Sequence, residues 1–140
     1  GHLVHLDQQD ILFLIGSFGA SAVLLYGTPG VPLAQPRNLM GGHILSALTG
    51  VLMYGWIADP LYLSGALSVA TAIAVMHLTK TTHPPGGATA LIAVIGSERV
   101  HQLGFLYVLS PVALGALIML VVALIVNNLT SFRRYPVFWW

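Results

Sequence analysis

His83-Pro84-Pro85-Gly86-Gly87-Ala88-Thr89 opens a run without charged residues that continues to Gly96 and decides the fold. Its apolar part, residues 88–96, is about half as long as the roughly 20 apolar residues that a membrane-spanning helix needs. Short apolar segments broken by proline and glycine usually line a solute path, because irregular backbone survives at membrane depth only beside protein or water. The motif therefore predicts a membrane protein that moves or binds a small solute.

The composition of the whole chain also predicts a membrane protein. Apolar residues make up 56% and charged residues 6% of the 140 residues, whereas soluble domains carry about 25% charged residues. The absence of cysteine excludes disulfides and thiolate metal sites, and a net charge of +1 excludes a basic surface for nucleic acid. The charged side chains bracket the apolar stretches: Asp7, Asp10, Arg37, Asp59, Lys80, Glu98, Arg99, Arg133 and Arg134.

Five apolar segments lie between these charges, at residues 11–26, 39–58, 61–79, 88–96 and 103–129. The second and third match the roughly 30 Å thickness of the hydrocarbon core. In the fifth, Ser110-Pro111 predicts that the continuous helix begins near Pro111, because serine caps helices and proline suits the first turn. In the first, residues 16–21 predict a break similar to the one that opens the fourth.

An internal duplication is indicated by a shift of 68 positions, which aligns residues 19–24 with residues 87–92 and Ser21 with Thr89. In each copy a polar connection and a long helix follow the aligned segment. The alternative is that small residues recur in membrane helices for packing alone. The first copy lacks the long helix that leads the second, and residues 1–10 are too polar to supply it, so a processed or truncated chain is expected.

The basic residues select a topology. If all five segments cross the membrane, Arg37, Lys80, Arg133 and Arg134 share one side and only Arg99 lies on the other; a re-entrant fourth segment would split them three against two. The first arrangement fits the positive-inside rule and places the C-terminus inside. The predicted fold is an all-α membrane bundle of about five transmembrane segments, an inverted repeat with two broken half-helices whose N-termini meet near the midplane.

Several ordered motifs resemble the HPP family of integral membrane proteins. They are Gly16-Ser17-Phe18-Gly19-Ala20-Ser21-Ala22-Val23-Leu24-Leu25, Gln35-Pro36-Arg37-Asn38 with Gly41-Gly42-His43, His83-Pro84-Pro85-Gly86-Gly87-Ala88-Thr89-Ala90, and Asn127-Asn128-Leu129. The resemblance implies one HPP transmembrane domain over residues 1–140. It also implies nitrite transport, in which chloroplast and cyanobacterial relatives are implicated. The expected location is a bacterial inner membrane or a chloroplast or thylakoid-related membrane, with the C-terminus cytoplasmic or stromal.

The predicted ligand site lies at the two breaks and suits a small anion. Helix N-termini present free N–H groups and a partial positive charge. Pro84 and Pro85 fix the backbone, Gly86 and Gly87 allow close approach, and hydroxyl groups add donors. The remaining site residues from the breaks are Ser17, Phe18, Gly19, Ala20, Ser21, Ala88 and Thr89. The alternative is that these small residues only let helices pack closely.

Arg37, Asn38 and the intramembrane histidines complete the candidate ligand-binding set. Arg37 can hold an oxyanion through its planar donor fork, or serve only as an inside charge. His43 and His83 can bind the anion when protonated or carry a coupled proton, and the alternative is a neutral imidazole bonded to backbone. His77 is a weaker candidate, and His2, His5 and His101 are interpreted as loop residues.

The asparagines and aromatic residues near the ends of the apolar segments are expected to have structural roles. Asn127 and Asn128 are expected to cap the last helix or, alternatively, to line the inner mouth. Tyr135, Phe138, Trp139 and Trp140 are expected to form an interfacial aromatic anchor, with Tyr54, Trp56 and Tyr62 at the other interface.

Three functions follow from these residues. The leading hypothesis is a transporter or channel for a small inorganic anion such as nitrite, without enzymatic activity or cofactor. The second is a non-transporting structural subunit of a larger membrane complex. A metalloenzyme using His43, His77 and His83 ranks last, because no two of them share a helix face at ligand spacing. Expected partners are the lipid bilayer, the anion, and a homo-oligomer or larger membrane complex.

Overall fold

The computed structural model describes residues 6–140, and every regular element in that range is a helix. Its main helices are α1 (Gln8–Ala22), α2 (Pro36–Trp56), α3 (Leu61–Leu78), α4 (Pro85–Ile95), α5 (Glu98–Leu103) and α6 (Leu114–Val126). Two π-helical turns, η1 (Val23–Gly27) and η3 (Val108–Ala113), extend α1 and precede α6, and a 3-10 turn, η2 (Pro32–Ala34), leads into α2. The all-helical prediction is confirmed.

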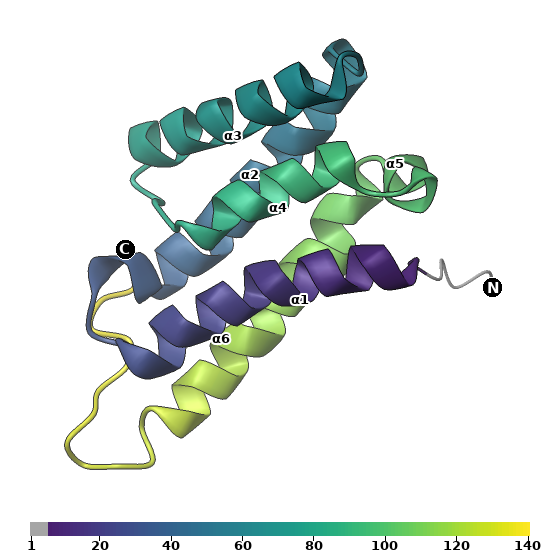
Figure 1. Ribbon diagram of the computed structural model, residues 1–140. Coiled ribbons are helices and arrows are strands. Elements are labelled where there is room, and N and C mark those ends of the chain that lie inside the picture. The colour runs from purple at the N-terminus through teal and green to yellow at the C-terminus, as the bar shows by residue number, and fades with distance from the viewer. Residues whose placement is uncertain (1–5) are drawn as a thin grey trace.

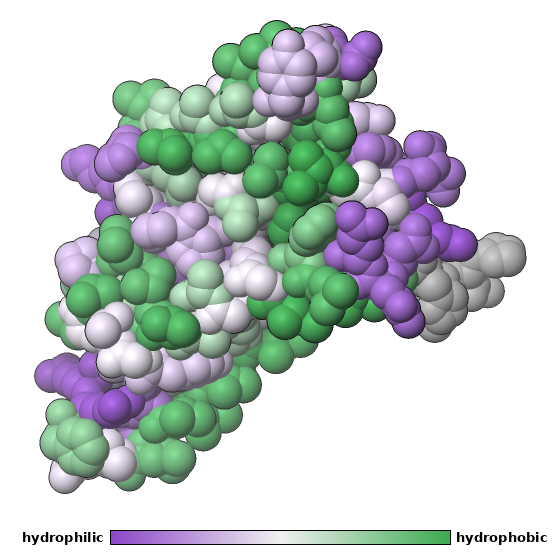
Figure 2. Space-filling view, viewed as in Figure 1, coloured by the Kyte–Doolittle hydropathy of each residue, from purple (hydrophilic) through white to green (hydrophobic). Residues whose placement is uncertain are grey.

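The outer surface is that of an integral membrane protein. Three helical stretches, Gln8–Gly27, Leu61–Leu78 and Val108–Val126, are long and apolar enough to cross a membrane, and Pro85–Ile95 is a shorter apolar helix. Large apolar side chains such as Leu12, Leu78 and Leu114 are exposed on their outer faces. In Figure 2, hydrophilic residues gather at the two ends and hydrophobic residues cover much of the belt between them. Lipid contact accounts for an apolar surface of this extent.

The helices are packed around α2 and α4, which run in the same direction (Figure 1). α3 lies against both, and α1 lies on the other side of α4. Asp10 near the start of α1 accepts a hydrogen bond from the backbone N–H of Ser97, after the end of α4. Ser21 near the end of α1 contacts His83, just before α4. These contacts place α1 antiparallel to α4.

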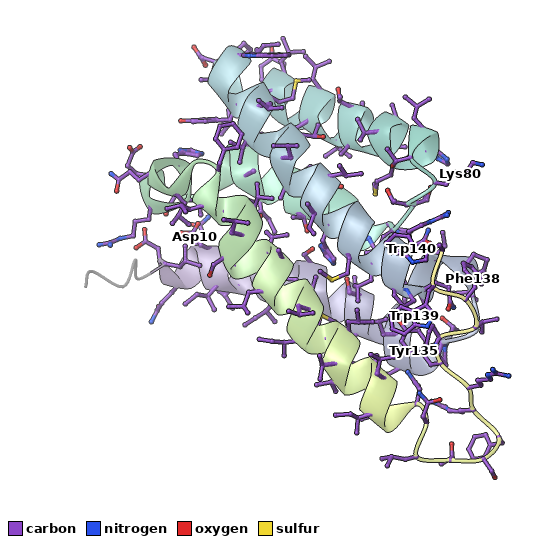
Figure 3. All side chains as sticks on the ribbon, turned by 180° about the vertical axis from the view of Figure 1, so that it is seen from behind. Asp10, Lys80, Tyr135, Phe138, Trp139 and Trp140 are labelled. Atoms are coloured by element: carbon purple, nitrogen blue, oxygen red, sulfur yellow. The ribbon has the colours of Figure 1, made fainter. Side chains whose placement is uncertain are left out.

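The charged residues divide between the two ends of the bundle. At one end Arg99 Nε lies 3.0 Å from Asp7 Oδ1. At the other, Arg37 donates a hydrogen bond to the carbonyl of Lys80, and Arg133 donates to the carbonyl of Tyr26. Figure 3 shows Asp10 and Lys80 at these opposite ends. Arg37, Lys80 and Arg133 thus lie at one end of the bundle and Arg99 at the other, while the five crossings and the side of the membrane that each end faces stay predictions.

The predicted break in the first segment is wrong. α1 runs without interruption through residues 16–21, and its irregular backbone comes later, in η1. Gly16 and Gly19 are exposed, and a Cβ added to either would meet no atom within 4 Å. These glycines therefore lie on the outer face of an ordinary helix, where the backbone hydrogen bonds need no interruption.

α4 is the half-helix that the sequence predicts. It has 11 residues and begins at Pro85, three residues earlier than the apolar run, because proline fits the first helical turn. In the last segment Ser110 has non-helical angles (φ −141°, ψ 121°), so the continuous helix starts near Pro111 as predicted. α1 and α4 run in opposite directions, but residues 6–140 contain only one short half-helix of this kind, so the inverted repeat stays a prediction.

Residues at the two ends differ in part from expectation. His101 is not a loop residue: it lies in α5, where its ring stacks on Tyr54 with the centroids 3.7 Å apart. Tyr135 is buried and donates to the carbonyl of Ala34, so it packs inside, and burial raises the pKa of its hydroxyl. Trp139 and Trp140 are exposed, as an interfacial anchor requires. His2 and His5 lie outside the described residues.

The two asparagines after α6 bind backbone carbonyls. Asn128 donates to the carbonyl of Leu124 in the last turn of α6, as a cap does. Asn127 instead donates to the carbonyl of Leu25 at a distance of 2.9 Å, which ties the end of α6 to η1.

Candidate functional site

Five buried polar side chains meet where α1, α2 and α4 pack together. Ser17 and Ser21 come from α1, His43 from α2, His83 from the connection before α4, and Thr89 from α4. Each is at most 2% exposed. We call these five residues the histidine network.

Hydrogen bonds join all five members of the network. Ser21 Oγ lies 2.8 Å from His43 Nε2 and 2.8 Å from His83 Nε2. His43 Nδ1 lies 2.8 Å from Thr89 Oγ1, which lies 2.9 Å from Ser17 Oγ. His83 Nδ1 lies 2.8 Å from the carbonyl oxygen of Leu33. The two imidazole rings are 4.9 Å apart between centroids, so the histidines also touch each other.

Helix periodicity and two glycines bring these side chains together. Ser17 and Ser21 are four residues apart and therefore share one face of α1. A Cβ at Gly42 would lie 2.4 Å from His83 Cβ, and a Cβ at Gly86 would lie 2.8 Å from the carbonyl oxygen of Gly42. Only glycine permits this approach of α2 to the His83 connection and to α4.

Arg37 and Asn38 hold the connection that carries His83. Asn38 Nδ2 donates to the carbonyl of Thr82 at 2.8 Å, and Arg37 donates to the carbonyl of Lys80. Lys80 has φ 57°, and the N–H of Thr81 bonds to the carbonyl of Met76, which forms a left-handed helix end. Arg37 and Asn38 therefore position His83 and do not enter the network themselves.

The structure brings together only part of the predicted site. Besides the five network residues, the Phe18 ring packs on His43 with centroids 5.3 Å apart, and the carbonyl oxygen of Pro85 lies 3.0 Å from Ser17 Oγ. Gly87 faces Val69 of α3 instead. Four predicted residues are exposed on the outer surface: Gly19, Ala20, Pro84 and Ala88.

The prediction of two converging helix N-termini is wrong. α1 is continuous and has no N-terminus at this depth. At the start of α4, Pro85 has no N–H group, the N–H of Gly86 bonds to the carbonyl of His83, and the N–H of Gly87 bonds to the carbonyl of Pro84. Local turns thus already use the donors that the anion hypothesis assigned to this helix end.

Two partners of the network were not predicted from the sequence. Tyr107 is buried and donates to the carbonyl of Thr89 at 3.0 Å. The carbonyl of Leu33 is a backbone group and leaves no signal in a sequence. Gln35 is buried outside the network, where its side-chain N–H groups donate to the carbonyls of Pro29 and Val31.

The third histidine named for a metal site lies elsewhere. His77 is exposed on α3 and has no place in the network. Across residues 6–140 no group of three His, Cys, Asp or Glu side chains is arranged to hold a metal ion.

Comparison with known proteins identifies the family. The family model described as "HPP, transmembrane region" matches residues 2–136. The chain belongs to the HPP family. One transmembrane protein of Dictyostelium discoideum is 52% identical over 136 residues, which cover 95% of this HPP chain and 43% of the relative. A second from the same organism is 48% identical over 138 residues, 96% of this chain and 48% of the relative.

The HPP chain thus spans less than half the length of these two relatives. No solved structure matches it.

A surface hollow of about 290 Å³ lies near the network in this HPP chain. It is lined by Pro36, Arg37, Met40, Gly41, Thr81, Leu120, Trp139 and Trp140. Arg37 Nε is buried and has no hydrogen-bond partner. Gly41 and Thr81 pack against each other next to the Gly42–His83 contact, so the hollow ends close to His83 without exposing it.

Proposed function

We propose that this chain is a transporter or channel for a small inorganic anion, with nitrite as the first candidate. The observation that carries the proposal is the histidine network, a group of two histidines and three hydroxyl residues buried among apolar helices. Ionisable groups inside membrane proteins are costly and usually mark the path of a solute or a proton. Hydroxyl and imidazole N–H groups are also suitable donors for the oxygens of a small oxyanion.

The network represents an occluded state in this proposal. Ser21 is fully buried and its oxygen is shared between two imidazoles, which leaves no room for a solute. An anion would enter by replacing the contacts of Ser21 with the histidines, and a proton on one imidazole would balance its negative charge. The enclosure of Ser21 also favours transport over hydrolysis, since a nucleophilic serine needs access to its substrate.

The hollow beside Arg37 is the proposed inner mouth of the path. Its volume of about 290 Å³ exceeds what a triatomic anion requires, and Arg37 supplies a fixed positive charge at its edge. Trp139 and Trp140 line its outer side. In the proposed topology this mouth faces the cytoplasm or stroma, because it lies at the end that carries Arg37, Lys80 and Arg133.

Nitrite uptake into proteoliposomes tests the function. His43→Gln and His83→Gln should each lower uptake by roughly tenfold or more, because each removes one hydrogen-bonding nitrogen from the network. His77→Gln is the matched control, since His77 is exposed outside the network. Protein-free liposomes measure the leak of nitrous acid. Uptake equal to that leak would exclude the proposed function, and protein-dependent uptake that is unchanged in both network variants would exclude the network as its site.

A structural subunit is the second candidate, and one observation favours it. The network side chains bond to one another or to backbone carbonyls, as in a purely structural polar core. In that case the two glutamine variants would destabilise the protein without any nitrite flux in the wild type.

A further inference from the structure

The carbonyl of Leu33 fixes the positions of the protons at one end of the histidine network. A carbonyl only accepts, so His83 Nδ1, 2.8 Å away, carries the hydrogen. Neutral His83 then has a bare Nε2, which accepts from the hydroxyl of Ser21.

The position of this proton determines the positions of the other protons in the network, one after another. The hydroxyl of Ser21 has a single hydrogen, and once it is donated to His83, Ser21 accepts from the Nε2–H of His43. Nδ1 of His43 is then bare and accepts from Thr89, which in turn accepts from Ser17. The alternative acceptors are backbone carbonyls at longer distances: 3.0 Å from Ser17 to Pro85, 3.3 Å for Ser21 and 3.5 Å for Thr89. Ser17 donates to Thr89 because the hydroxyl hydrogen of Thr89 is already donated to His43. Five hydrogen bonds therefore point the same way, from Ser17 to the carbonyl of Leu33.

We propose that His43, Ser21 and His83 form a proton relay inside the membrane. An extra proton on His43 Nδ1 makes an imidazolium whose Nε2–H passes its proton to Ser21 Oγ. The hydroxyl proton of Ser21 passes at the same time to His83 Nε2. His43 ends neutral and protonated on Nδ1, His83 ends as the imidazolium, and Ser21 stays a neutral hydroxyl that now points to His43. One positive charge has moved between the rings, and no heavy atom has left its place.

The surroundings of the two rings leave such a proton free to move. α1 presents Phe18 and the two serines, α4 presents Thr89, and the chain before η3 presents Tyr107, whose hydroxyl binds the carbonyl of Thr89. Among residues 6–140 no Asp, Glu, Lys or Arg side chain hydrogen-bonds to the network. With no carboxylate to trap it, the proton is shared by two similar groups, as a relay needs.

The role of the relay rests on the proposed anion transport. The positions of its protons do not depend on that proposal and can be measured separately. Nitrogen-15 NMR of histidine-labelled protein in bilayers reports which ring nitrogen carries hydrogen. At neutral pH we expect His43 protonated on Nε2 and His83 on Nδ1, with the signals assigned by His43→Gln and His83→Gln. The same tautomer at both residues, or the reverse order, would overturn the relay whether or not nitrite is transported.

Ser21→Ala tests proton transfer directly. It removes the bridge but leaves His43 its bond to Thr89 and His83 its bond to Leu33. The ratio of nitrite uptake with an acidic exterior to nitrite uptake at equal pH should fall by roughly tenfold or more, whatever the variant does to the uptake at equal pH. Ser68→Ala is the matched control, because Ser68 is equally buried but bonds to the carbonyl of Ala90.

The two hypotheses fail in different ways. Wild-type pH stimulation in Ser21→Ala would refute the relay and leave anion transport standing. No protein-dependent nitrite flux in the wild type would refute the proposed function, and the tautomers would still decide the relay.

Discussion

Gly50 is the position where the packing of α2 on α4 can be tested most sharply. A Cβ there would lie 2.4 Å from the carbonyl oxygen of Ala90 and 2.7 Å from the Cβ of Ala93. Ordinary contact begins at 3.4 Å, so Gly50→Ala must push the two helices apart by about 1 Å.

The expected cost combines two opposing effects. Overpacking a tight contact costs about 1–3 kcal/mol, and the obstacle here is backbone, which places the cost at the upper end. The better helix propensity of alanine returns about 1 kcal/mol. We expect a net loss of about 2 kcal/mol in unfolding free energy. Because Thr89 is adjacent to Ala90, the same displacement should weaken the contact between Thr89 and His43.

Unfolding by SDS in mixed micelles, followed by tryptophan fluorescence, measures the change. Gly16→Ala and Gly55→Ala are matched controls, because a Cβ at either position meets no atom within 4 Å and alanine should be neutral or slightly stabilising. If Gly50→Ala unfolds at the same SDS fraction as these controls, the helices are not in backbone contact at this crossing and the reasoning is refuted.

Three further predictions concern the ends of the bundle. Single cysteines at positions 37 and 80 of this cysteine-free chain should be labelled from one face of the membrane and position 99 from the other; joint labelling of 80 and 99 would exclude five crossings. Lys80→Gly should raise the unfolding free energy by about 0.5–1 kcal/mol, since glycine adopts φ 57° without steric cost, and a destabilised variant would contradict the left-handed helix end. Asp10→Ala should lower the unfolding free energy by about 1–3 kcal/mol, because the buried carboxylate accepts from both the N–H and the hydroxyl of Ser97, whereas the exposed Asp59→Ala should have little effect.

The sequence predicted the elements whose signals are local. The two prolines before α4 and the Ser110-Pro111 pair mark helix starts because proline restricts its own backbone and that of its neighbour. The prediction of a break at residues 16–21 was wrong because small residues occur in membrane helices for two different reasons. In α4, Gly86 permits close contact with α2, whereas Gly16 and Gly19 of α1 only lie on the outer surface. Composition alone does not distinguish these two uses, because they differ in which residues of the neighbouring helix pack against the glycine.

The candidate site was predicted in its residue types and not in its geometry. His43, His83, Ser17, Ser21 and Thr89 were all named, because polar groups in apolar segments stand out. The hydrogen bonds among them depend on how α1 lies across α4, and the partner that fixes their protons is the backbone carbonyl of Leu33. Tyr107 was not predicted because an aromatic residue within an apolar segment is usually a packing residue.

The two serines of the network lie on the same helix, α1, so a movement of that helix changes the contacts of both serines together. Apart from the contact of their rings, His43 and His83 are linked to each other only through Ser21. If α1 shifts away from α4, the Ser17–Thr89 bond and both bonds of Ser21 break in one movement. The same shift opens the space that an anion needs. In the proposed transporter, admitting a solute would therefore disconnect the two histidines in the same movement. Proton transfer between them would then be possible only while α1 lies against α4.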